Sequence, residues 1–119
     1  MKIKVPVKDE DYFDKLVSLF SNIPPFSKLR PKGLELYAKL LQYNHRWSRL
    51  PFNERNTLIF STDYKEEMAK TMGIELSGVY NLMKELKQAG IIEKDKLIVK
   101  YTLPKVKEVK FEFIEENEA

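Results

Sequence analysis

The chain has 119 residues, of which 43% are hydrophobic and 33% are charged, a composition that fills one apolar core and disfavours disorder or membrane spans. It contains 21 Lys plus Arg against 18 Asp plus Glu, one histidine, His45, and no cysteine. These counts exclude disulfides and cysteine-ligated zinc, and they leave too little histidine for a histidine metal site or a Ser-His-Asp triad. We therefore expect a non-enzymatic protein with no cofactor and no bound metal.

The first 30 residues predict a short strand followed by a helix. Apolar residues alternate with lysine and proline over 3–7, and Pro6 restricts such a strand to a sheet edge because proline lacks the N–H donor. Three acids at 9–11 suit the positive end of a following helix. Apolar residues at helical spacing occupy 12–20, and consecutive prolines at 24 and 25 end the helix.

Residues 31–60 predict a helix, a loop and a buried strand. Pro31 suits the first turn of the helix, and an apolar stripe at helical spacing covers 34–41. This periodicity is lost over 45–56, where Pro51 favours a loop. The run 57–60 is short, apolar and β-prone, so we expect a buried strand there.

Residues 61–101 predict two helices and a β-hairpin. A serine or threonine at 61–62 caps the first helix, which ends at Gly73, and Ser77 caps the second, which ends at Gly90. A hairpin with a charged turn is expected over 91–99. The apolar residues expected on the inner faces of the two helices are Tyr64, Met68, Ala69, Met72, Val79, Leu82, Met83, Leu86 and Ala89.

The order of helix, strand, helix, short turn, helix and hairpin over 31–101 resembles a winged helix. Ala69 stands where the two helices of a helix-turn-helix approach closely, and Gly73 stands at the turn. The whole chain resembles the small winged-helix proteins encoded by tailed bacteriophages. We therefore expect one α+β domain over 1–119 with a winged-helix core over 31–101. An N-terminal strand and helix over 1–30 and a C-terminal strand with an acidic tail over 102–119 are additions outside the family pattern.

The resemblance implies one candidate nucleic-acid surface, the exposed face of the second helix. Amide side chains there can pair with adenine edges, and lysines with guanine or phosphate. Residues 57–101 nevertheless hold seven lysines against seven acids and no arginine, so we expect weak, strongly salt-dependent duplex binding with little sequence preference, carried mainly by Arg46, Arg49 and Arg55. A solvated polar face is the alternative for this helix. The residues of this candidate surface are Ser77, Tyr80, Asn81, Lys84, Lys87 and Gln88.

A second candidate surface lies in the middle of the chain, where residues 27–56 hold seven Lys and Arg against two acids. Arginines interleaved with aromatic residues are typical of protein interfaces and of nucleic-acid contacts. The alternative is that the aromatic residues cover one end of the core while the arginines stay in water. The candidate interface residues in this segment are Tyr43, Arg46, Trp47, Arg49, Phe52 and Arg55.

The two ends of the chain provide the remaining candidate interface. Alternation over 109–114 predicts a last strand, and its apolar residues Phe111 and Phe113, with Val5 and Val7 of the first strand, need either the domain's own sheet or a neighbouring chain to cover them. We therefore predict a virion structural or assembly protein, in a portal, connector or neck ring, that contacts other subunits as a homo-oligomer or a hetero-assembly. A duplex-DNA-binding regulator or replication accessory factor is the alternative. Either protein is expected in the virion or the host cytoplasm, without membrane contact.

Overall fold

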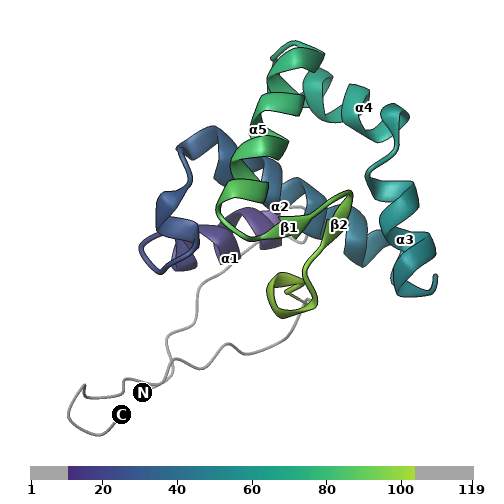
Figure 1. The fold of residues 1–119 in the computed structure, drawn as a ribbon, viewed down its shortest axis with the longest axis horizontal. Helices are drawn as coiled ribbons and strands as arrows, with labels where there is room; N and C mark the ends of the chain where they lie inside the picture. The colour runs from purple at the N-terminus through teal and green to yellow at the C-terminus, as the bar shows by residue number, and fades with distance from the viewer. Residues whose placement is uncertain (1–10, 104–119) are drawn as a thin grey trace, which may run out of the picture.

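The computed structural model describes residues 11–103, so both predicted terminal strands lie outside the described residues. Within this range, the helices pack together with one small antiparallel sheet on their outer side, which agrees with the expected α+β architecture (Figure 1). The elements are helix α1 (Tyr12–Phe20), 3-10 helix η2 (Phe26–Lys28), helices α2 (Pro31–Arg46), α3 (Phe52–Ile59), α4 (Thr62–Met72) and α5 (Leu76–Gln88), strands β1 (Ile92–Glu93) and β2 (Lys96–Leu97), and 3-10 helix η3 (Val99–Tyr101).

Helix α2 lies at the centre of the fold, between α1 on one side and α5 on the other (Figure 1). Apolar residues are frequent along this helix, and four of them are fully buried: Leu36, Tyr37, Leu40 and Leu41. These four positions span more than one side of a helix that turns about 100° per residue, so α2 can pack against two layers at once. One contiguous hydrophobic core extends from α1 through α2 to α5 and the hairpin.

Most of the predicted helix boundaries are confirmed. Pro31 is the first residue of α2, and the Ser61 hydroxyl caps α4 by accepting a hydrogen bond from the Tyr64 N–H at 3.3 Å. Gly73 ends α4 with a φ of +67°, a left-handed conformation that a residue with a Cβ rarely adopts. Gly90 follows α5 with a φ of +80°.

The predicted strand over 57–60 is wrong, because residues 57–59 belong to helix α3 and Phe60 is its C-cap. The helix begins after Pro51, whose carbonyl accepts from the Arg55 N–H at 2.8 Å, and it buries Asn56 and Ile59 on one face. The observed loop is therefore shorter than the one predicted over 45–56, and it comprises the five residues between Arg46 and Phe52. A run of four apolar residues fits a strand or a helix equally well, and here the burial of a helical face decided the outcome.

The predicted cap of α5 is also wrong, and the predicted hairpin is shorter than expected. Glu75, not Ser77, precedes the first turn, and its carbonyl accepts from the Val79 N–H at 3.3 Å, so the helix begins one residue before Ser77. The hairpin is confirmed, with Ile92 opposite Leu97 and Glu93 opposite Lys96.

A buried asparagine joins the hairpin to α3. The Asn56 side chain is fully buried; its Nδ2 donates to the Phe52 carbonyl at 2.8 Å, and its Oδ1 accepts from the Leu97 N–H at 2.9 Å. The second bond satisfies a backbone donor of β2 that would otherwise need a third strand. Outside the core, the Lys96 ammonium also donates to Asn53 Oδ1 at 3.0 Å.

Replacing Leu86 with alanine tests the assignment of the core. Leu86 is fully buried on α5, so Leu86→Ala is expected to lower the free energy of unfolding by about 2–5 kcal/mol through lost burial and a residual cavity. The same change at Leu19, which is 54% exposed on α1, is expected to cost less than about 0.5 kcal/mol. Chemical denaturation measures both, and equal losses would contradict the burial assigned to α5.

Replacing Asn56 with alanine tests the link between α3 and the hairpin. Asn56→Ala leaves the buried Leu97 N–H without its acceptor, at an expected cost of about 1–3 kcal/mol. The matched control is Asn53→Ala, which removes an exposed amide that bonds only the solvated Lys96 ammonium. Hydrogen exchange of the Leu97 amide is expected to accelerate in the first variant alone. An unchanged exchange rate in Asn56→Ala would refute the anchoring role.

Candidate nucleic-acid interface

Helix α5 presents a polar face to solvent. Val79, Leu82, Met83 and Leu86 are buried on its inner side, at the spacing of one helical face. The six residues predicted for a nucleic-acid surface are all exposed: Ser77, Tyr80, Asn81, Lys84, Lys87 and Gln88. At about 100° per residue, Ser77, Asn81, Lys84 and Gln88 form the middle of this face. Amide, hydroxyl and ammonium groups are therefore gathered on one side of α5.

Glu85 is the one acidic residue within α5, and it turns away from this face towards the start of α2. Its Oε1 accepts from the backbone N–H of Arg30 at 2.7 Å, and its Oε2 accepts from Arg30 Nε at 3.1 Å and Nη2 at 2.9 Å. The Glu85 side chain is 16% exposed, whereas that of Arg30 is 74% exposed. The carboxylate is thus largely withdrawn from the solvent-exposed face.

Glu85 approaches α2 closely at Gly33. A Cβ on Gly33 would lie 3.0 Å from Glu85 Oε1, a tight contact that would require the carboxylate to shift by a few tenths of an ångström. Beside this contact, a groove of about 480 Å³ separates the start of α2 from α5. Arg30, Pro31 and Lys32 line one side of the groove, and Ile74, Gly78, Asn81 and Leu82 line the other.

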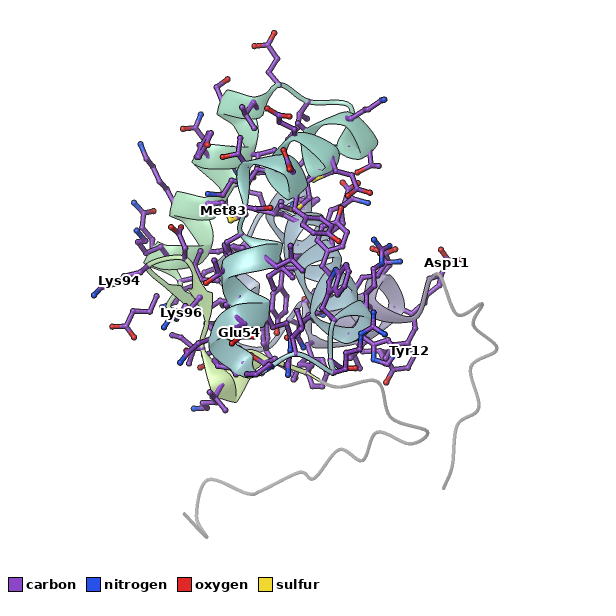
Figure 2. All side chains as sticks on the ribbon, turned by 90° about the vertical axis from the view of Figure 1, so that its right-hand side faces the viewer. Asp11, Tyr12, Glu54, Met83, Lys94 and Lys96 are labelled. Atoms are coloured by element: carbon purple, nitrogen blue, oxygen red, sulfur yellow. The ribbon has the colours of Figure 1, made fainter. Side chains whose placement is uncertain are left out.

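The opposite edge of the α5 face meets α4 and the hairpin. The Lys65 ammonium lies 5.0 Å from the centre of the Tyr80 ring and 3.9 Å from the Asp95 carboxylate. Lys94 has a φ of +55° in the hairpin turn, and its side chain extends away from the fold at the edge of the molecule, above Lys96 (Figure 2). Lysines of α4 and the hairpin therefore flank this edge, and Lys65 offsets the charge of Asp95.

Part of the second predicted surface makes contacts within the fold and is not available to a partner. We call residues 43–55, from the end of α2 to the start of α3, the α2–α3 connection. Arg55 joins three groups of this connection, because Nη1 donates to Asn44 Oδ1 at 3.1 Å and Nη2 donates to the carbonyls of Ser48 at 3.2 Å and Leu50 at 2.8 Å. Its guanidinium also lies 5.9 Å from the centre of the half-buried Phe52 ring. These contacts make Arg55 a structural residue of the connection.

The aromatic residues of this surface also pack inward. Trp47 is half-buried, and its Nε1 donates to the Tyr64 hydroxyl at 2.7 Å. The Tyr64 ring lies 4.4 Å from the ring of Tyr43, which is buried. Burial, with a smaller contribution from the Glu67 carboxylate, raises the pKa of Tyr43 to about 12, so its hydroxyl stays protonated at neutral pH.

Arg46 and Arg49 are the accessible part of the second surface. Both are exposed, and their guanidinium groups lie 5.4 Å from the Tyr43 ring centre and 5.8 Å from the Trp47 ring centre, respectively. The remaining predicted interface residues, Val5, Val7, Phe111 and Phe113, lie outside the described residues. The structure therefore separates Arg46 and Arg49 from the structural Arg55, a distinction that composition could not make.

Sequence reasoning missed Arg30 and Lys32 as neighbours of α5. Arg30 and Glu85 are 55 positions apart, and no periodicity connects them. The sequence offered one indication that Glu85 contacts another element. At about 100° per residue, Glu85 lies at the edge of the α5 face and points away from Lys84.

Acidic residues elsewhere do not assemble a metal centre. Within residues 11–103, no group of three or more His, Cys, Asp or Glu residues could hold a metal ion. Asp14 lines a cavity of about 250 Å³ between α1 and α2. Burial raises the pKa of Asp14, and the nearby Lys39 opposes this shift. Over the same part of the chain, no helix has the length and apolar character needed to cross a membrane.

Replacing Glu85 tests the contact between α5 and α2. Glu85→Ala removes the acceptor of three hydrogen bonds, and the expected cost is about 1–3 kcal/mol of unfolding free energy. Most of this cost is attributed to the short bond from the backbone of Arg30, because water screens the exposed guanidinium. The neighbouring Lys84→Ala is the control and is expected to stay within about 0.5 kcal/mol of wild type. Thermal and urea unfolding measure both, and equal stability of the two variants would contradict the contact.

Models of protein families, curated proteins and solved structures give no match to this chain. Its function is therefore inferred from the chemistry of its own surfaces. The α5 face carries donors and acceptors bordered by positive charge, whereas the α2–α3 connection carries two exposed guanidinium groups on aromatic rings. The first is suited to reading a polymer with an anionic backbone, and the second to contacting a planar or acidic partner.

Proposed function

We propose that residues 31–103 form a winged-helix variant that binds duplex DNA, with α5 in the major groove and the hairpin as the wing. The order of α2, α4, α5 and hairpin supports this assignment. Helix α3 stands where a winged helix has its first strand. In place of that strand, the Asn56 side chain supplies the hydrogen bond to Leu97 of β2.

One observation carries the proposal: α5 exposes six polar or cationic side chains while its only carboxylate is bound to Arg30. Asn81 and Gln88 have the paired donor and acceptor that match an adenine edge, and Lys84 can donate to guanine or phosphate. A helix fits the major groove, where each base pair displays a distinct pattern of such groups. The α5 face therefore has the chemistry for direct readout of bases.

The pairing of Glu85 weakens the main objection that arises from the sequence. Residues 57–101 are neutral in total, but Glu85 is paired with Arg30, which lies outside this segment. The positive field of the exposed lysines is therefore less opposed at α5 than the totals suggest.

Assembly into a bacteriophage virion is the second candidate, and it depends on Arg46 and Arg49. Exposed arginines stacked on aromatic rings are frequent at the energetic centres of protein interfaces. A ring or connector subunit could use them to contact another subunit. We rank this candidate below DNA binding because Tyr43, Trp47 and Arg55 are engaged within the fold.

Selection of duplexes from a random DNA pool, followed by fluorescence anisotropy titrations, tests the proposal. Asn81→Ala is expected to weaken binding to the selected duplex by about 1–3 kcal/mol, roughly 5- to 150-fold, with a smaller effect on unrelated duplexes, because it removes a base contact. Lys15→Ala, an exposed lysine of α1, is the control and is expected to bind like wild type.

Two outcomes would contradict the DNA-binding function. The first is the absence of duplex binding by the wild-type protein even at low salt. The second is duplex binding that is insensitive to Asn81→Ala and Lys84→Ala but is lost in Arg46→Ala or Arg49→Ala. This second result would move the interaction to the α2–α3 connection and favour the assembly candidate.

A further inference from the structure

We propose that Arg30 and Lys32, at the start of α2, bind DNA backbone phosphates beside the α5 face and form a contact outside the α4–α5–hairpin unit. This inference rests on the proposed DNA-binding function and deepens it by naming the residues that position α5. The two residues would hold one strand of the duplex without reading its sequence, because phosphates carry no base information.

The groove between α2 and α5 places these cations beside a candidate base-reading side chain. Arg30 and Lys32 line one side of its volume of about 480 Å³, and Asn81 lines the other. Asn81 also belongs to the middle of the exposed α5 face. A strand whose bases reach Asn81 would therefore bring its phosphates close to the start of α2.

Arg30 is held in place but still has donors to offer. Glu85 takes hydrogen bonds from the Nε and Nη2 atoms of Arg30, and this pairing fixes the plane of the guanidinium. Among the described residues, no hydrogen bond is formed by Nη1, and the side chain is 74% exposed. A phosphate can therefore bind the outer edge of a group whose orientation is already set, which lowers the entropic cost of binding.

Lys32 can exchange its present partners for a phosphate. Its ammonium lies 3.3 Å from both Glu35 Oε2 and the Met72 carbonyl, and its side chain is 55% exposed. The pair with Glu35 is a solvent-exposed ion pair between residues three apart, a class that contributes little to stability. The partial positive charge at the start of the 16-residue helix α2 adds to the attraction for an anion.

The α5 face then has cationic side chains along both edges. Gly78 and Glu85 face α2, whereas Tyr80, about 140° away from Glu85 around the helix, faces Lys65 of α4. A helix in the major groove has a phosphate backbone on each side, about 12 Å apart. Arg30 and Lys32 would contact one backbone, and the exposed Lys94 of the hairpin would lie towards the other, whereas the Lys65 side chain is 11% exposed and lies against Tyr80 and Asp95.

The salt dependence of binding tests this inference. The apparent affinity of wild-type protein, Lys32→Ala, Arg30→Ala and the control Lys15→Ala is measured between about 50 and about 200 mM salt, on a selected duplex and on an unrelated duplex. Loss of one phosphate contact is expected to reduce the slope of log affinity against log salt by about 0.9. Lys32→Ala and Arg30→Ala are expected to show this reduction equally on both duplexes, whereas Lys15→Ala keeps the wild-type slope.

The outcomes distinguish a failure of this inference from a failure of the proposed DNA-binding function. If duplex binding depends on Asn81 and Lys84 but Lys32→Ala retains the wild-type slope, the inference is wrong and the DNA-binding function stands. An effect of Lys32→Ala on the selected duplex alone would also overturn the backbone role. Absence of duplex binding by wild type would reject both. If Arg30→Ala lowers the stability of the fold, the Lys32→Ala result is the decisive one, because the Lys32 side chain takes no part in the Glu85 contact.

Discussion

The burial of helix α2 is the constraint on which the other elements depend. Leu36, Tyr37, Leu40 and Leu41 are fully buried, and α1, α3 and α5 all pack against this helix. Because a tightly packed interior tolerates few voids, the positions of these side chains fix where the neighbouring helices cross α2. The polar face of α5 is consequently presented to solvent in one orientation.

Two polar contacts then refine the position of the candidate site. Glu85 joins α5 to the start of α2, and Asn56 joins α3 to β2 of the hairpin. Both contacts pair a side-chain oxygen with a backbone N–H outside the regular helix and sheet hydrogen bonds, and loss of the second would leave the buried Leu97 donor unsatisfied. The first orients α5 and the second orients the hairpin, which are the two elements expected to meet DNA.

The same contacts explain why local charge totals mislead here. A carboxylate that is bound to a guanidinium and a helix start no longer opposes a phosphate as a free acid does. Arg55 is the converse case, since its charge is directed at the carbonyls of the α2–α3 connection. Counts of charged residues therefore do not tell which of these groups remain available to a partner and which are engaged within the fold.

Local sequence patterns determined the helices α1, α2, α4 and α5, the hairpin and the exposed face of α5, because their apolar periodicity and the glycines at 73 and 90 act within a few residues. The same patterns failed at 57–60, where a four-residue apolar run carries no period and burial of Asn56 and Ile59 selected a helix. Only the tertiary structure decided the pairing of Glu85 with Arg30 and the placement of Lys32 beside Asn81. These contacts join residues far apart in the chain, and they exist because α2 and α5 pack together, a long-range event that no local pattern encodes.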